Sequence, residues 1–235
     1  GHPKRGPPTR DRAASYSVTA EHNSAAPPGR GGRPAARRVV SPAEVPAKTT
    51  PQVWVPLPMQ RDFLACGAYE VFAGGAAGPG KSEGLVVAPL RWVHIEGFRA
   101  VLFRNTFPEL ERTLIAKSRR FYPQRGGKYR ETSHTWTFPS GAEVTFAYLE
   151  RDADVHRYQG AEFSFVGFDE LPHFTEYQYR YLGSRLRSAV PGLPVRLRAT
   201  GNPDGPHLAW VRARFADWIE GRVPMGESAW YDPDG

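Results

Sequence analysis

The chain has 235 residues, of which 40% are hydrophobic and 12% aromatic, so it can bury the core of one α/β domain. It contains a single cysteine, which excludes a disulfide framework and a cysteine-rich metal site. The sequence has no apolar run as long as a transmembrane helix, and we therefore expect no membrane partner.

The net charge of +7 is unevenly placed, because residues 1–50 hold nine Lys and Arg against three Asp and Glu. These residues are rich in Pro, Ala, Gly, Arg and Ser, and they show no sustained periodicity. We expect a disordered basic N-terminal arm, which either contacts nucleic acid or is simply solvated. An ordered domain is expected over 51–222, followed by a tail or linker over 223–235.

Residues 53–60 are expected to be extended, and residues 61–68 to form a short helix. Gln60 lies at this junction. Its side-chain amide can donate and accept hydrogen bonds at once, which makes it a candidate for reading an adenine edge. A surface glutamine at the start of a helix would give the same pattern.

A glycine-rich segment at 75–82 matches every fixed position of the P-loop pattern G-x-x-x-x-G-K-[ST]. A strand is predicted before it, over 69–73, and a helix after it, over 83–92. In this context Lys81 is expected to reach the β- and γ-phosphates, and the Ser82 hydroxyl to bind Mg²⁺. Pro79 lacks an N–H and cannot donate to phosphate. The predicted nucleotide-binding residues are Gly75, Ala76, Ala77, Gly78, Pro79, Gly80, Lys81 and Ser82.

The next elements are predicted in chain order as a strand over 99–104, a helix over 109–121 capped by Thr106, a loop over 123–130, a hairpin of 135–138 and 143–148, and a charged connection over 150–160. In the helix, Leu110, Leu114 and Ile115 should point inward. Its other face is basic, and either contacts a DNA backbone or is solvated.

An apolar strand predicted over 163–168 ends in two adjacent carboxylates, Asp169 and Glu170. This arrangement is typical of a Walker B element, although an ordinary boundary between a strand and a loop can look alike. Downstream of an intact P-loop, we expect Asp169 to hold Mg²⁺, and Glu170 to orient and deprotonate an attacking water.

A helix is predicted over 175–187, capped by Thr175, with Tyr177, Tyr181 and Leu182 inward. A strand over 195–199 follows and leads into Thr200, Gly201 and Asn202. These polar residues either sense the γ-phosphate and couple hydrolysis to motion, or form an ordinary Asn-Pro turn. A final amphipathic helix is expected over 207–219.

The order of these elements predicts an α/β P-loop NTPase of the ASCE/RecA-like class. Its central sheet should be mainly parallel and flanked by helices, with a β-hairpin insertion.

Six segments, taken in order, resemble the ATPase domain of tailed-bacteriophage terminase large subunits. The resemblance covers roughly residues 53–220. The segments are 55–64, 74–82, 157–162, 168–170, 184–187 and 200–203.

The resemblance implies an ATP-hydrolysing motor that moves double-stranded DNA into a procapsid, with ATP and Mg²⁺ as cofactors. It implies a portal protein, a small terminase subunit and a homo-oligomeric ring, usually a pentamer, as partners. The implied location is the host bacterial cytoplasm, transiently at the portal vertex. Gln60 would match the family's adenine-reading residue, and residues 200–202 its coupling motif.

The family also implies an arginine that reaches each ATP site from a neighbouring subunit. Some relatives carry it immediately before the glycine that precedes Walker B, where this chain has Gln159. Arg157, Arg185 and Arg187 therefore remain candidates. Large terminases carry a C-terminal nuclease domain as well, which we expect to be absent from this chain, together with its activity.

Two other classes compete with this interpretation. One is a different P-loop enzyme, such as a helicase-like ATPase acting on nucleic acid or a small-molecule kinase. The other is a nucleotide-binding scaffold module with an inactive site. The intact set of Lys81, Ser82, Asp169 and Glu170 favours hydrolysis over both a kinase and a scaffold.

Overall fold

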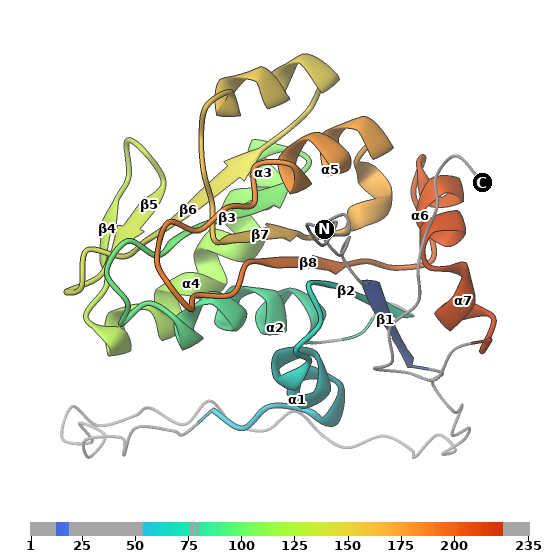
Figure 1. Ribbon diagram of the computed structural model, residues 1–235, viewed down its shortest axis with the longest axis horizontal. Helices are drawn as coiled ribbons and strands as arrows, with labels where there is room; N and C mark the ends of the chain where they lie inside the picture. Colours follow the sequence, from blue (N-terminus) through green and yellow to red (C-terminus); the bar gives the residue numbers. More distant parts are fainter. Residues whose placement is uncertain (1–12, 19–53, 76–77, 79, 223–235) are drawn as a thin grey trace, which may run out of the picture.

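One eight-stranded sheet crosses the molecule (Figure 1) in the order β1-β2-β8-β7-β3-β6-β5-β4. The structure is a computed structural model, and it describes residues 13–18, 54–75, 78 and 80–222. Its strands are β1 (Ala13–Val18), β2 (Glu70–Gly75), β3 (Arg99–Arg104), β4 (Lys128–Arg130), β5 (Thr135–Thr137), β6 (Glu143–Tyr148), β7 (Phe165–Phe168) and β8 (Arg196–Thr200).

The sheet is mixed. Strands β1, β2, β8, β7, β3 and β6 pair in parallel, whereas β5 and β4 add to the β6 edge in antiparallel pairs. The predicted hairpin is confirmed as β5–β6. Because parallel strands end at one edge, the residues at or just after the carboxyl ends of β2, β8, β7 and β3 come together there.

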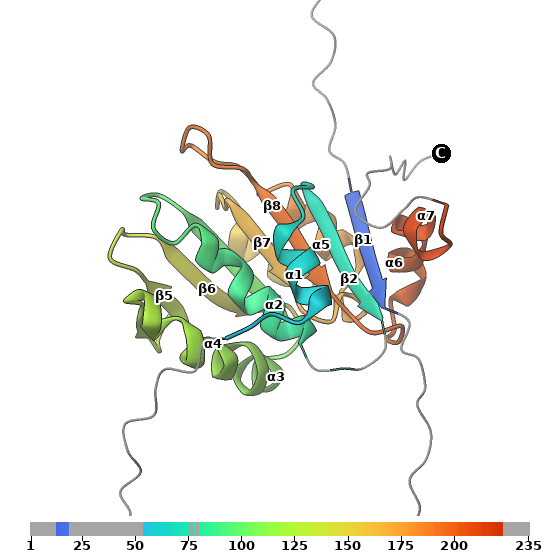
Figure 2. The same cartoon turned by 90° about the horizontal axis from the view of Figure 1, so that it is seen from below.

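Helices cover both faces of the sheet, as Figures 1 and 2 show from two sides. One face carries α1 (Pro58–Ala65), α2 (Lys81–Val87), η1 (Ala88–Arg91) and the helical stretch α3–η2–α4 (Phe107–Leu110, Glu111–Ile115, Ala116–Phe121). The other face carries η4 (Asp152–Tyr158), η5 (Leu171–His173), α5 (Glu176–Gly183), α6 (Leu208–Arg214) and α7 (Ala216–Ile219). A short 3₁₀ turn, η3 (Pro123–Arg125), follows α4.

Two apolar clusters fill the spaces between the sheet and these helices. Members of the first include Phe63, Leu85, Leu114, Phe146 and Phe165. Members of the second include Phe103, Phe168, Phe174, Tyr179 and Phe215. Each fully buried side chain of this size contributes about 1.5–3 kcal/mol to stability, so the two clusters hold the sheet edge described below in a fixed geometry.

Strand β1 was not anticipated. Residues 13–18 were assigned to the disordered arm, yet they pair in parallel with β2 in the structure. The remainder of the predicted arm, residues 1–12 and 19–50, lies outside the described residues, as does the predicted tail at 223–235.

Several helix boundaries differ from the predictions. Helix α1 begins at Pro58, within the stretch expected to be extended, because proline is favoured in the first turn. The helix predicted over 83–92 consists of α2 followed by the 3₁₀ turn η1. Thr106 lies at the N-cap position of α3, as predicted, but its side chain makes no capping hydrogen bond.

The inward predictions for Leu110, Leu114 and Ile115 are confirmed, and the helical stretch that holds them contains a π-helical segment, η2. The predicted loop over 123–130 contains the additional strand β4, which pairs with β5. No helix in the described part of the chain combines the length and hydropathy needed to cross a bilayer.

Helix α5 ends at Gly183, four residues earlier than predicted. Thr175 caps it as expected, because its hydroxyl accepts from the Gln178 N–H at 3.2 Å. Tyr177 was predicted to point inward but is 46% exposed, whereas Tyr179 and Leu182 are buried. The last predicted helix is divided at Phe215 into α6 and α7.

Candidate active site

The candidate site lies at the carboxyl edge of the parallel strands. Asp169 and Glu170 follow β7, Thr200 ends β8, and Arg104 ends β3. Strand β8 lies between β2 and β7, and β3 flanks β7 on the other side. The sheet order therefore brings together side chains that are far apart in the sequence.

Asp169 is buried, with 1% of its surface exposed. Its Oδ1 accepts from the Thr200 hydroxyl at 2.7 Å, and its Oδ2 accepts from Arg104 Nη1 at 2.9 Å. A buried carboxylate without such partners would carry a desolvation cost of several kcal/mol. Both oxygens are thus fixed in direction, and each retains a free lone pair for a further donor or cation.

Glu170 adopts a left-handed backbone conformation, with φ 58° and ψ 60°, which is uncommon for a residue with a side chain. Asn202 holds the carboxylate, donating from its backbone N–H to Oε2 at 3.1 Å and from its Nδ2 to Oε1 at 3.2 Å. The remaining Asn202 oxygen, Oδ1, is buried without a hydrogen-bond partner in the described part of the chain. It is an acceptor that water or a ligand can use.

Arg104 is the residue that the sequence interpretation missed. Besides Asp169, its guanidinium contacts Glu109 at 3.3 Å and approaches Glu170 to 3.9 Å. Its side chain is 12% exposed, so three carboxylates surround one nearly buried cation. The only sequence signal for Arg104 is its position as a polar residue at a strand end. That position points to the site only because β3 lies beside β7.

The glycine-rich loop joins β2 to α2. Gly75 and Gly80 have φ of 136° and 117°, values that suit glycine and strain other residues. Lys81 begins α2, and its Nζ donates to the Gly75 carbonyl at 3.3 Å across the loop. Ser82 follows, and its side chain makes no hydrogen bond to the described residues. Ala76, Ala77 and Pro79 lie outside the described residues.

Burial and nearby negative charges both act on the Lys81 ammonium group. Burial lowers the pKa of its ammonium group, and the negative charges of Glu170, Asp169 and Asp204 oppose that change. The charges of Asp169 and Glu170 therefore act on the lysine, although it begins a different element.

Gln60 lies beside the loop, and 2% of its surface is exposed. Its Nε2 donates to the Gly80 carbonyl at 2.8 Å, and its Oε1 accepts from the Leu57 N–H at 2.8 Å. The side chain thus links α1 to the loop. Reading an adenine edge would use the second N–H of Nε2 and the second lone pair of Oε1.

Gly201 separates Thr200 from Asn202 and is closely packed. A Cβ added there would lie 2.7 Å from Pro172 Cδ, shorter than real contacts of this kind. Its N–H donates to the Ala73 carbonyl at 3.2 Å, which ties the end of β8 to β2. The segment predicted to couple hydrolysis to motion, residues 200–202, therefore packs against Pro172 and bonds to β2.

The three arginines proposed as a finger do not join this cluster. Arg157 pairs with Asp154 at 2.8 Å, and Arg187 pairs with Glu162 at 3.8 Å. Arg185 lies over the Tyr181 ring, and its Nε is buried with no partner among the described residues.

The backbones of Arg185 and Arg187 bond to Phe163, which precedes β7. These two residues therefore lie toward the opposite end of β7 from Asp169.

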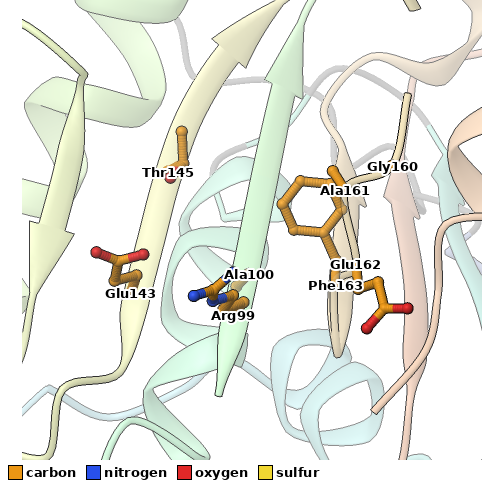
Figure 3. A pocket seen from close by; sticks show the side chains of 8 residues that line it. All are labelled: Arg99, Ala100, Glu143, Thr145, Gly160, Ala161, Glu162 and Phe163. Carbon is orange, nitrogen blue, oxygen red and sulfur yellow. The ribbon is translucent and has the colours of Figure 1, made fainter. Parts of the chain in front are cut away.

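A pocket of about 270 Å³ opens at the amino ends of β3 and β6, away from this site (Figure 3). Arg99 lies within it, between Glu143 on β6 and the segment of Gly160 to Phe163. None of the residues predicted to act in the site lines the pocket.

The donor set fits a magnesium ion that is completed by phosphate. The described residues contain no group of three or more His, Cys, Asp or Glu side chains placed to hold a metal by themselves. Mg²⁺ characteristically uses one or two protein carboxylates plus substrate phosphates and water. Asp169, whose oxygens each accept one bond from the described residues, and Ser82, whose hydroxyl bonds none of them, suit that mode.

Two solved structures of phage large terminases share the fold. The large terminase of a thermophilic bacteriophage is similar with a TM-score of 0.55 and 19% sequence identity, over 70% of this chain and 43% of that one. The HK97 bacteriophage large terminase gives a TM-score of 0.50 and 11% identity, over 73% and 38%. The chain thus spans less than half the length of either protein. No protein with a curated description matches it.

A sequence model described as "Terminase large subunit, T4likevirus-type, N-terminal" matches residues 72–227, about two thirds of the chain. The match begins in β2, just before the glycine-rich loop, and extends past α7. The chain therefore belongs to the family of N-terminal regions of terminase large subunits.

Proposed function

We propose that this chain is an Mg²⁺-dependent ATPase that powers translocation of double-stranded DNA into a viral procapsid. One observation carries the proposal. The two carboxylates after β7 are held by Thr200 and Asn202 from β8 and its following turn, at the sheet edge where the glycine-rich loop joins β2 to α2. Family membership makes a packaging motor the appropriate context for this site.

Each side chain has a role in the proposed reaction. Lys81 binds the β- and γ-phosphates, after exchanging its bond to the Gly75 carbonyl. Asp169 and Ser82 hold the cation. Mg²⁺, when bound, would supply positive charge that offsets the negative charge of the phosphates. Glu170 orients the attacking water and takes its proton.

The assignment to the ASCE/RecA-like P-loop NTPases belongs to the same proposal. Strand β8 supports it, because it lies between β2 and β7 and carries Thr200 to Asp169. Asn202, which holds Glu170, is followed closely by α6. A change at Glu170 can thus be passed along this connection to α6.

The proposed partners are double-stranded DNA, a portal protein, a small terminase subunit and further copies of this chain in a ring, with the host cytoplasm and portal vertex as location. Gln60 is proposed to read adenine. Arg157, Arg185 and Arg187 remain candidates for the arginine that a neighbour supplies. Because such a finger contributes about 10³–10⁵ in rate, turnover should rise steeply with protein concentration.

The test is steady-state ATP turnover, with and without double-stranded DNA, for the wild type and for Glu170→Gln across a range of protein concentrations and on portal-bearing procapsids. We expect DNA-stimulated turnover in the wild type and a loss of at least about 100-fold in the variant. Equal turnover by both proteins under every condition would show that Glu170 does not act as the base. Nucleotide binding without turnover by the wild type under every condition would favour a nucleotide-binding scaffold module with an inactive site.

A further inference from the structure

Arg104 occupies a position in the acidic cluster that no sequence motif predicted. The cluster consists of Glu109, Asp169 and Glu170, all within 4 Å of the Arg104 guanidinium. Its formal charge without Arg104 is −3. Asp169 is 1% exposed and Arg104 is 12% exposed, so bulk water screens their interaction poorly.

Arg104 bonds Asp169 Oδ2, the carboxylate oxygen that Thr200 leaves available. The same Nη1 lies 3.9 Å from Glu170 Oε1. One nitrogen is thus positioned toward both Walker B carboxylates. A cation bound to Asp169 would meet the positive charge of Arg104 at close range.

We propose that Arg104 is a positioning residue that serves as the resident counter-ion of Asp169 and Glu170, and that a divalent cation must compete with it for Asp169. The guanidinium holds the buried carboxylate in a fixed direction while the cation is absent. Its positive charge then opposes cation binding, so that the site gains the ion together with nucleotide phosphates and not before them.

The proposal deepens the proposed function, on which it rests for the identity of the cation site. The unpartnered Asn202 Oδ1 is a second observation at the same site. A buried acceptor without a donor, bonded through its own amide to Glu170, indicates that the cluster is built to receive a further group.

The chain offers a matched control on the same strand. Arg99 begins β3 and Arg104 ends it, so Arg99→Gln removes the same charge from the same element. Arg99 is exposed, and its side chain makes no ion pair or hydrogen bond within the described residues. A general effect of net charge would appear equally in both variants.

The experiment measures Mn²⁺ binding by electron paramagnetic resonance on the whole chain without nucleotide. We expect Arg104→Gln to bind Mn²⁺ at least about tenfold more tightly than the wild type, because repulsion is removed. Arg104→Lys and Arg99→Gln should match the wild type. Adding Asp169→Asn to Arg104→Gln should abolish the gain in Mn²⁺ affinity.

Unchanged or weaker Mn²⁺ binding by a folded Arg104→Gln variant would overturn the proposal. Weaker binding is expected if Arg104 only supports Asp169, because its removal would then leave the carboxylate misplaced. Should Arg104→Gln not fold, the double variant Arg104→Gln/Glu109→Gln removes one charge of each sign. Its Mn²⁺ affinity is compared with that of Glu109→Gln alone, and the double variant is expected to bind Mn²⁺ more tightly. Because no nucleotide is present, the result can be interpreted even if the chain proves unable to hydrolyse ATP.

Discussion

Asn202 donates two hydrogen bonds to the carboxylate of Glu170, one from its backbone and one from its side-chain amide. The two residues are 32 positions apart and follow neighbouring strands, β7 and β8. The contact fixes the direction of the proposed base, and it does so from the segment that leads into α6. Under the proposed function, a change in the orientation of Glu170 would therefore act on the segment that leads into α6.

Replacing Asn202 by alanine should lower kcat for ATP hydrolysis by at least about tenfold, with a smaller change in KM. The side-chain donor to Glu170 Oε1 would be lost, while the backbone N–H to Oε2 remains. Steady-state kinetics on the folded variant check this expectation. An unchanged kcat with a lowered melting temperature would mean that the contact serves stability alone.

Gly201→Ala should destabilise the chain by about 1–3 kcal/mol, because the new Cβ would press on Pro172, Phe72 and the Leu171 backbone. Gly183→Ala is the matched control, since its Cβ would make an ordinary contact of 3.5 Å with Leu197. Urea denaturation of both variants gives the comparison. Equal stability of the two would show that β8 shifts freely at Gly201.

The stability of the ligand-free protein should depend on pH through Lys81. Burial lowers the pKa of this lysine below 10.5, its usual value. Between the lowered pKa and 10.5 the unfolded chain binds more protons than the folded one. Stability contributed by this group therefore rises with pH across that window.

Lys81→Met removes this effect. The melting temperature of the wild type, relative to the variant, should rise from pH 7 toward pH 10.5. Lys128→Met, at an exposed lysine on β4, controls for loss of charge. If the difference in melting temperature between the wild type and Lys81→Met stays constant or falls over this pH range, the burial of the ammonium group is contradicted.

Glu70 forms a second buried ionic contact, at the start of β2. Its Oε2 accepts from Arg214 Nη2 at 2.8 Å, and its Oε1 accepts from the Tyr179 hydroxyl at 2.6 Å. Arg214→Met should cost about 3–5 kcal/mol, because it leaves Glu70 buried at 2% exposure without the two N–H donors of Arg214. Adding Glu70→Gln to this variant should recover part of the loss. Additive effects of the two substitutions in equilibrium unfolding would argue against a coupled pair.

Local features of the site could be predicted from the sequence. The glycine-rich loop and the adjacent carboxylates Asp169 and Glu170 are short, contiguous patterns whose chemistry depends on neighbouring residues. The capping role of Thr175 was predictable for the same reason, since its partner Gln178 is three residues away.

Contacts between residues on different strands of the sheet could not be predicted in this way. Arg104 and Asp169 are 65 residues apart, and they meet because β3 pairs with β7, a choice that depends on the packing of the whole sheet. The inward orientation predicted for Tyr177 is wrong for a different reason. Leu182 is buried as predicted, but the buried side of α5 includes Tyr179 and leaves Tyr177 exposed.

The most direct test of the account is the fate of ATP bound to Glu170→Gln. The chain is mixed with Mg²⁺ and γ-labelled ATP at high protein concentration, and bound ATP and released phosphate are followed in a single turnover. We predict that the variant binds ATP with an affinity within about threefold of the wild type but keeps it intact while the wild type releases phosphate. Phosphate release by Glu170→Gln at the wild-type rate would contradict the assignment of Glu170 as the base.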